Sequence, residues 1–218
     1  MVLLALALAP ALAIMIYIYI KDKYEREPVK LLLKNFGLGA TASIVITLII
    51  GLVLKLIFPT VDPLSVPEQF FKAFIVVALV EEFSKYIIVR YYAQRNKEFD
   101  EPFDGIVYAV MVSMGFAALE NILYVYQFGM ANGIVRAFTA VPAHASFAII
   151  MGYYMGKAKF APTKKEKIKL NLTGLFAATL FHGAYDFFLF INFIPGISIG
   201  AFISLIIGLF LSRKAIKK

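Results

Sequence analysis

Residues 80–85, Val-Glu-Glu-Phe-Ser-Lys, place Glu81, Glu82 and Lys85 inside a run, residues 70–92, that is otherwise almost entirely apolar or aromatic. The run is long enough to cross a bilayer of about 30 Å as a helix. Each central Glu or Lys costs roughly 2.5 to 3.5 kcal/mol on insertion scales, whereas each Leu, Ile, Val or Phe returns only about 0.3 to 0.6 kcal/mol. We therefore expect the three charges to have partners on other helices or in a water-filled cavity.

The composition is that of a membrane protein. Of the 218 residues, 61% are hydrophobic and 17% are charged, and the mean hydropathy is +0.81, far above the range of soluble domains. No cysteine is present, which excludes disulfides and thiolate metal sites. The net charge of +8 would suit nucleic acid, but the basic residues lie between the apolar runs. We expect a lipid bilayer as the partner and no nucleic acid.

The spacing of the apolar runs predicts an all-α, polytopic protein with about seven transmembrane helices. A short interfacial helix, residues 24–35, is expected after the first span and should begin near Pro28. No internal repeat is visible, so we expect one transmembrane domain over residues 1–218. The predicted spans are residues 2–20, 36–58, 68–92, 105–128, 137–156, 170–193 and 197–212.

The distribution of basic residues predicts the orientation. Loops 21–35, 90–104 and 157–169 and the tail 213–218 hold 18 of the 22 Lys and Arg residues. Because positive charge stays on the cytoplasmic side, the amino terminus should face outward and the carboxyl terminus inward.

Four consecutive predicted spans carry ionisable groups. A rise of about 1.5 Å per residue brings these groups to one layer near the bilayer centre. Intramembrane ionisable residues mark functional sites by default. The ionisable residues of this layer are Glu81, Glu82 and Lys85 on the third span, Glu120 on the fourth, His144 on the fifth, and His182 and Asp186 on the sixth.

Several of these residues also have plain structural interpretations. Lys85 can serve as the counter-ion that keeps Glu81 ionised, since the two are four residues apart. Asp186, four residues after His182, is expected to orient that imidazole. Asn121 can either bond a neighbouring helix or belong to the site.

The residue types point to hydrolysis. A carboxylate in a low-dielectric site can take a proton from water, and a histidine can stabilise the oxyanion that develops. Ser84 has no histidine at helical spacing, which disfavours a serine mechanism. Glu82, His144 and His182 would also make a zinc ligand set with one position left for water, but no HExxH motif is present. Metal-dependent and metal-free chemistry both stay open.

The combined motifs resemble the PrsW family of membrane proteases. They are Glu81-Glu82-x-x-Lys85, Phe116-x-x-x-Glu120-Asn121, the isolated His144, His182-Gly183-x-Tyr185-Asp186, the loop 103–108, and Asp22-x-Tyr24-x-x-Glu27-Pro28. The chain is more distantly similar to CAAX prenyl endopeptidases and bacteriocin-immunity-type proteases. It departs from their pattern, with Lys85 one residue earlier than their arginine, Glu120 in place of a histidine and Asp186 in place of an asparagine.

The resemblance implies an intramembrane endopeptidase in a prokaryotic plasma membrane that makes the site-1 cut in a single-span anti-sigma factor. It implies that Glu81 and Glu82 activate water, with Glu120, His144 and His182 around the scissile bond. We expect Glu82 to be the general base if it faces the cavity, and His182 to stabilise the oxyanion or bind a metal.

Two other function classes compete. A proton-coupled transporter or ion pathway could be lined by the same residues, although the chain lacks the inverted repeat typical of secondary transporters. A non-catalytic scaffold could bind a partner's transmembrane helix through small residues such as Gly152 and Gly156.

Overall fold

The computed structural model describes residues 2–23, 25–59 and 61–217, and every regular element in these ranges is helical. The predicted all-α class is confirmed. In chain order the elements are α1 (Val2–Lys21), α2 (Val29–Leu38), η1 (Gly39–Ser43), α3 (Ile44–Ile57), α4 (Val66–Phe71), η2 (Lys72–Leu79), α5 (Val80–Tyr91), η3 (Ala93–Arg95), α6 (Asp104–Phe138), α7 (Ala140–Lys159), α8 (Lys164–Phe190) and α9 (Ile199–Ile216).

Within the described ranges, five helical stretches are long and apolar enough to span a membrane. They are Leu3–Lys21, Val29–Ile57, Asp104–Lys159, Lys164–Phe190 and Ile199–Ile216. The Asp104–Lys159 stretch contains both α6 and α7, which were predicted as separate spans. The charged stretch 66–91 is also helical but is not one of the five, because its apolar residues are interrupted by five ionisable side chains before Arg90. That the chain crosses the membrane seven times, with its amino terminus on the outer side, remains a prediction.

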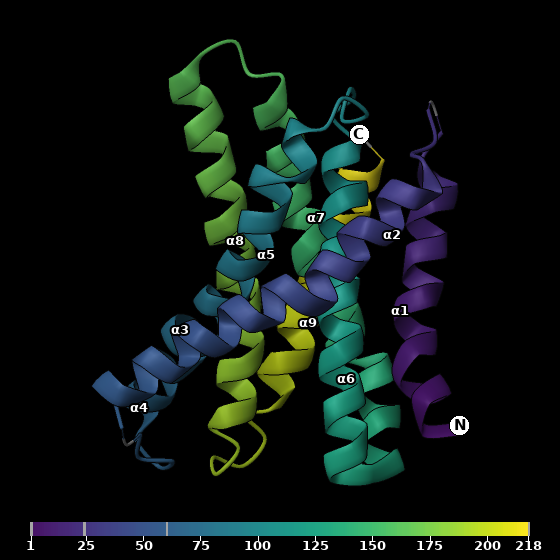
Figure 1. Ribbon diagram of the computed structural model, residues 1–218. Coiled ribbons are helices and arrows are strands. Elements are labelled where there is room, and N and C mark those ends of the chain that lie inside the picture. Colours follow the sequence, from purple (N-terminus) through teal and green to yellow (C-terminus); the bar gives the residue numbers. More distant parts are fainter. Residues whose placement is uncertain (1, 24, 60, 218) are drawn as a thin grey trace.

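The helix expected to begin near Pro28 does begin at Val29, but it does not end at residue 35 as the expected interfacial helix would. From Val29, α2 continues through the π-helical turn η1 into α3 and ends only at Ile57, so that one helix runs obliquely across the bundle (Figure 1). No proline interrupts this stretch, and Gly39 keeps helical dihedral angles. Tyr24 lies outside the described residues.

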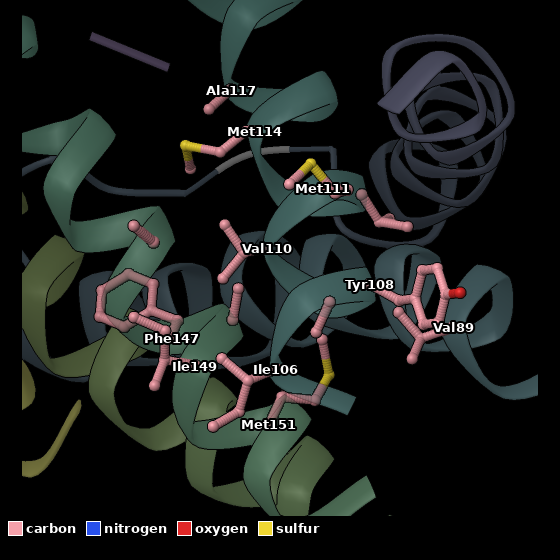
Figure 2. Close-up of a cluster of buried hydrophobic side chains, with 14 of the residues drawn as sticks. Val89, Ile106, Tyr108, Val110, Met111, Met114, Ala117, Phe147, Ile149 and Met151 are labelled. Atoms are coloured by element: carbon pink, nitrogen blue, oxygen red, sulfur yellow. The ribbon is translucent and has the colours of Figure 1, made fainter. Parts of the chain in front are cut away.

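Helix α6 forms the centre of the bundle and packs most extensively against α7. Ile106 and Val110 of α6 point toward Phe147 and Ile149 of α7, while Tyr108 lies on the opposite side of α6 (Figure 2). All five side chains are buried. This apolar core holds α6 and α7 at a fixed distance and so fixes the polar residues that the two helices carry.

Small residues allow α6 and α7 to touch through their backbones. A Cβ atom on Gly105 would lie 2.4 Å from the Gly152 carbonyl oxygen and 2.4 Å from the Gly156 nitrogen. Gly152 and Gly156, which we considered as a docking face for a partner's helix, are therefore buried inside the chain itself.

The lysine-rich connections gather at one end of the bundle. The ends of α1, α7 and α9 and the start of α6 lie at the end marked by the C-terminus, opposite the amino-terminal end of α1 (Figure 1). At the other end, α6 breaks at Gly129, whose φ of +82° is readily adopted only by glycine, and then continues as helix to Phe138. The connection between the predicted spans 105–128 and 137–156 is thus a break at one residue followed by a helical segment.

Candidate functional site

Lys85 lies at the centre of a buried polar cluster between α5, α6, α7 and α8. Its ammonium Nζ is 2.7 Å from Glu82 Oε1 and 3.6 Å from Glu81 Oε2. Lys85 and Glu82 are fully buried, whereas Glu81 keeps 9% of its surface exposed. We expected Lys85 to serve Glu81, but its shorter contact is with Glu82, three residues away on the same helix.

His182 of α8 joins the cluster from the opposite side. Its Nδ1 is 2.9 Å from Glu82 Oε1, and its Nε2 is 3.3 Å from Asp186 Oδ2 and 4.0 Å from Glu81 Oε2. The imidazole stacks on the Phe147 ring at a centroid distance of 5.0 Å. Both nitrogens therefore face carboxylates, and the apolar ring of Phe147 fixes the imidazole plane.

His144 of α7 completes the layer. Its Nδ1 is 3.3 Å from Lys85 Nζ and its Nε2 is 3.0 Å from Glu120 Oε2. An ammonium group can only donate, so Nδ1 accepts from Lys85 and the Nε2–H donates to Glu120. The ring centroids of His144 and His182 are 5.2 Å apart, which brings both imidazoles to one place.

Arg136 is a member of the cluster that sequence analysis missed. After the break at Gly129, the last part of α6 places Arg136 beside the part of α6 that precedes the break. There its Nη2 lies 2.7 Å from Glu120 Oε2, and its Nε donates to Asn121 Oδ1 at 2.8 Å. Asn121 Nδ2 in turn donates to the Ala7 carbonyl of α1. In the sequence, the feature that could have indicated this contact is Gly129, seven residues before Arg136. A glycine there allows the chain to reverse direction and bring Arg136 close to Glu120.

Ser84 does not face either histidine in the described structure. Its Oγ lies 2.6 Å from Ser43 Oγ and 3.0 Å from Thr47 Oγ1, and it donates to the Glu81 carbonyl oxygen. Ser84 therefore ties α5 to η1 and α3, in line with the weak case for a serine nucleophile.

The cluster contains a set of atoms suited to a metal ion. Glu81, His144 and His182 each offer one ligand atom, and these atoms lie within 4.8 Å of one another. Glu81 Oε2 is buried and has no hydrogen-bond partner among the described residues. One carboxylate and two imidazoles are a common zinc set that leaves a position for water, so the donor chemistry fits a metal. Glu82, which we named as a candidate ligand, lies outside this group because Lys85 and His182 engage its Oε1.

The cluster brings carboxylates that can accept a proton close to imidazole and ammonium groups that can donate hydrogen bonds, as hydrolysis requires. Glu81 and Glu82 each keep one oxygen without a hydrogen-bond partner among the described residues. What distinguishes them is access, because Glu81 is 9% exposed, whereas Glu82 is fully buried and its Oε1 contacts Lys85 and His182. The described part of the chain thus gathers every predicted site residue, from Glu81 on α5 to Asp186 on α8, in one connected network of contacts no longer than 4.0 Å.

Comparisons with known proteins agree with this chemistry. The family described as "PrsW family intramembrane metalloprotease" matches residues 27–212. The chain is 41% identical to Protease PrsW of Geobacillus kaustophilus over 169 residues, which are 78% of this chain and 71% of the relative. It is 38% identical to Protease PrsW of Bacillus subtilis over 176 residues, 78% of this chain and 74% of the relative. No solved structure matches the chain.

Proposed function

Because this chain belongs to the PrsW family of intramembrane proteases, we propose that it cuts a peptide bond of a single-span membrane protein at the cluster around Lys85. The chain is a peptide-bond hydrolase and a multi-pass bacterial membrane protein. The observation that carries the proposed site is the 4.8 Å grouping of Glu81, His144 and His182 in a buried layer.

Glu81 is the residue we propose to activate water. Its Oε2 accepts no hydrogen bond from the described residues, since Lys85 Nζ stays 3.6 Å away, and it lies within 4.0 Å of His182 Nε2, so a water molecule between them could give its proton to the carboxylate. The water oxygen then attacks the carbonyl carbon, the C–N bond breaks, and the proton passes from Glu81 to the leaving amine. This assignment replaces our expectation of Glu82 as the base.

Glu82 and Lys85 act as positioning groups in this proposal. Glu82 Oε1 accepts from Lys85 and lies 2.9 Å from His182 Nδ1, so it supports Nδ1 protonation and leaves Nε2 directed at Glu81 and Asp186. Lys85 and the Nε2–H of a His144 bound to Glu120 supply positive potential close to the carbonyl oxygen of a bound substrate.

A divalent metal such as zinc is compatible with the same residues. Glu81, His144 and His182 would hold it, and when bound it would act as a Lewis acid that polarises the carbonyl and lowers the pKa of water. Lys85 Nζ already lies 3.3 Å from His144 Nδ1. A metal held through that nitrogen would have to displace the ammonium from it.

The substrate we propose is an anti-sigma factor with one transmembrane helix. Support comes from the sequence resemblance to PrsW in the Glu81-Glu82 and His182 motifs. Support also comes from the depth of the site, since a helical substrate must enter from the lipid to reach residues buried between α5 and α8.

The test uses purified protein in liposomes with a single-span reporter whose fragments are identified by mass spectrometry. Wild type should yield one pair of fragments, Glu81→Gln should yield none, and the exposed matched control Glu98→Gln should cut like wild type. Equal cleavage by Glu81→Gln would remove the base assignment. Treatment with a chelator followed by metal analysis separates the two chemistries, because activity of a metal-free sample would exclude zinc.

The transporter alternative is not favoured by the family match. It makes a separate prediction in the same liposomes, namely a proton flux that Glu120→Gln abolishes. Flux without any reporter cleavage would support that alternative and contradict the protease site.

A further inference from the structure

Four lysines surround a cavity at the end of the bundle that carries the C-terminus. The cavity measures about 670 Å³ and lies between the ends of α1, α7 and α9 and the start of α6. Lys21, Lys23, Lys157 and Lys217 line it together with Glu101. It lies away from the Lys85 cluster and shares no lining residue with it.

The lysines stand at the level where lipid phosphates lie. Lys21 is the last residue of α1, Lys157 is in the last turn of α7, and Lys217 directly follows α9. All three helices belong to stretches long and apolar enough to span a membrane. Their ends therefore mark the boundary between hydrocarbon and headgroups.

These four lysines are not neutralised by any described carboxylate; the contacts of Lys21 and Lys157 are with the neutral side chains of Tyr17 and Tyr153. None forms an ion pair with a described carboxylate, and none donates to a described backbone carbonyl. Lys159 makes the contrast, because its Nζ donates to the Gln94 carbonyl oxygen at 2.6 Å. Four ammonium groups that face one cavity without a carboxylate to neutralise them repel one another, and an anion would relieve that repulsion.

The walls of the cavity are partly apolar. Phe103, Ile106, Ala215 and Ile216 line it beside the lysines. A free inorganic anion gains nothing from these side chains, whereas the glycerol backbone and first methylenes of a phospholipid would cover them. The combination of basic and apolar walls at a membrane boundary is typical of sites for anionic lipid headgroups.

We propose that this cavity binds the phosphate-bearing headgroup of an anionic phospholipid. The phosphate lies among Lys21, Lys157 and Lys217, and the proximal acyl region lies against Ile106 and Ile216.

Glu101 should weaken this binding. Its carboxyl group lines the cavity, and burial, followed by the charge of Asp104, raises its pKa to about 7. Near neutral pH the group is partly ionised and opposes the phosphate. Glu101→Gln should therefore tighten binding at pH 8 by several-fold and have little effect at pH 5.

The experiment measures lipids retained by the purified full-length chain in native mass spectrometry with phosphatidylglycerol or phosphatidylcholine of the same acyl chains. Wild type should bind one phosphatidylglycerol at least tenfold more tightly than phosphatidylcholine. The variant K21Q/K157Q/K217Q should lose that preference. The matched control K97Q/K164Q/K165Q removes the same charge from exposed lysines outside the cavity and should keep the preference within twofold.

Three outcomes would overturn the proposal. They are equal losses in the two triple variants, no preference over phosphatidylcholine in wild type, and displacement of the lipid by inorganic phosphate at equal affinity. The last outcome would identify a free phosphate site instead. Thermal midpoints in phosphatidylcholine check the fold, and if the triple variant unfolds, K157Q alone should still weaken phosphatidylglycerol binding at least threefold while K164Q should not.

Discussion

The molecule buries acidic groups in two regions and balances their charge in two different ways. In the Lys85 cluster, Glu82 and Glu120 each contact a basic side chain at 2.7 Å. In the second region, where α1, α2 and the start of α6 meet, Asp22 has two buried oxygens without hydrogen-bond partners among the described residues, and Glu27 accepts a hydrogen bond from Tyr108. The first region neutralises carboxylates with cations, whereas no described acid of the second region forms an ion pair within 4.0 Å, and Arg26 acts on Asp22 from beyond that distance.

In the second region, burial favours the protonated form of the acids. Burial raises the pKa of Glu27 to about 8, and the nearby charge of Asp104 adds to this effect. Burial also raises the pKa of Asp22, beside Glu101. Catalysis needs ionised groups at fixed positions, which only the first arrangement supplies. The paired cluster is therefore suited to chemistry, and the unpaired cluster is suited to responding to pH.

The largest expected effect follows from removing the open carboxylate of the paired cluster. Glu81→Gln keeps the shape but cannot take a proton, so reporter cleavage should fall by about 10³-fold, within the range for a lost general base. Rates from fragment quantification check this. Residual cleavage within tenfold of wild type would show that the cluster does not need this group.

The next effect concerns the cation that sequence analysis missed. Arg136→Gln leaves Glu120 without its 2.7 Å partner and should destabilise the protein by roughly 3 kcal/mol. The double variant Arg136→Gln/Glu120→Gln should recover most of that loss, because no buried charge stays unpaired. Denaturant titration in detergent measures the free energy of unfolding of both variants. If the double variant is as unstable as the single one, loss of charge balance is not the cause of the destabilisation.

The unpaired cluster should make stability fall with rising pH. Glu27 has a folded pKa of about 8 and an ordinary value of 4.5, so its contribution is fully present below pH 4.5 and is lost as pH rises to about 8. The thermal midpoint should drop over this window by several degrees. Glu27→Gln should flatten the drop, while the exposed neighbour Glu25→Gln should leave it unchanged.

The smallest effect is expected at Ser84, which is buried but bonded only to neutral groups in the described structure. Ser84→Ala removes its contacts with Ser43 and Thr47 and should cost about 1 kcal/mol. Cleavage should stay within threefold of wild type. A loss approaching that of Glu81→Gln would revive a serine nucleophile and place the chemistry on the other face of α5.

Much of the fold was predictable because apolar runs of about 20 residues admit few arrangements. The residues at which the helices end or bend were harder to predict. Residues 24–35 carry enough charge to resemble an interfacial helix, yet no residue between Val29 and Ile57 stops the helix. The return of Arg136 depends on the dihedral angle of Gly129, and a sequence shows that glycine can adopt φ near +82° without showing that it does.

The members of the site were predictable from the cost of charge in a membrane, but their pairing was not. Glu81 and Glu82 differ by about 100° around one helix, and the sequence does not show which one faces His182 Nδ1. The rotation of α5 decides this, and that rotation is set by contacts such as Ser84 with Ser43. Sequence spacing likewise paired Lys85 with Glu81, whereas its shortest contact is with Glu82.

The most direct test of the central claim, that acids and imidazoles from four helices form one water-activating site, is reporter cleavage in ¹⁸O-labelled water. Wild type should place one ¹⁸O in the new carboxyl terminus of the amino-terminal fragment, and Glu81→Gln and His182→Asn should produce no labelled fragment while Glu98→Gln matches wild type. Labelled product at wild-type rate from either variant would contradict the claim.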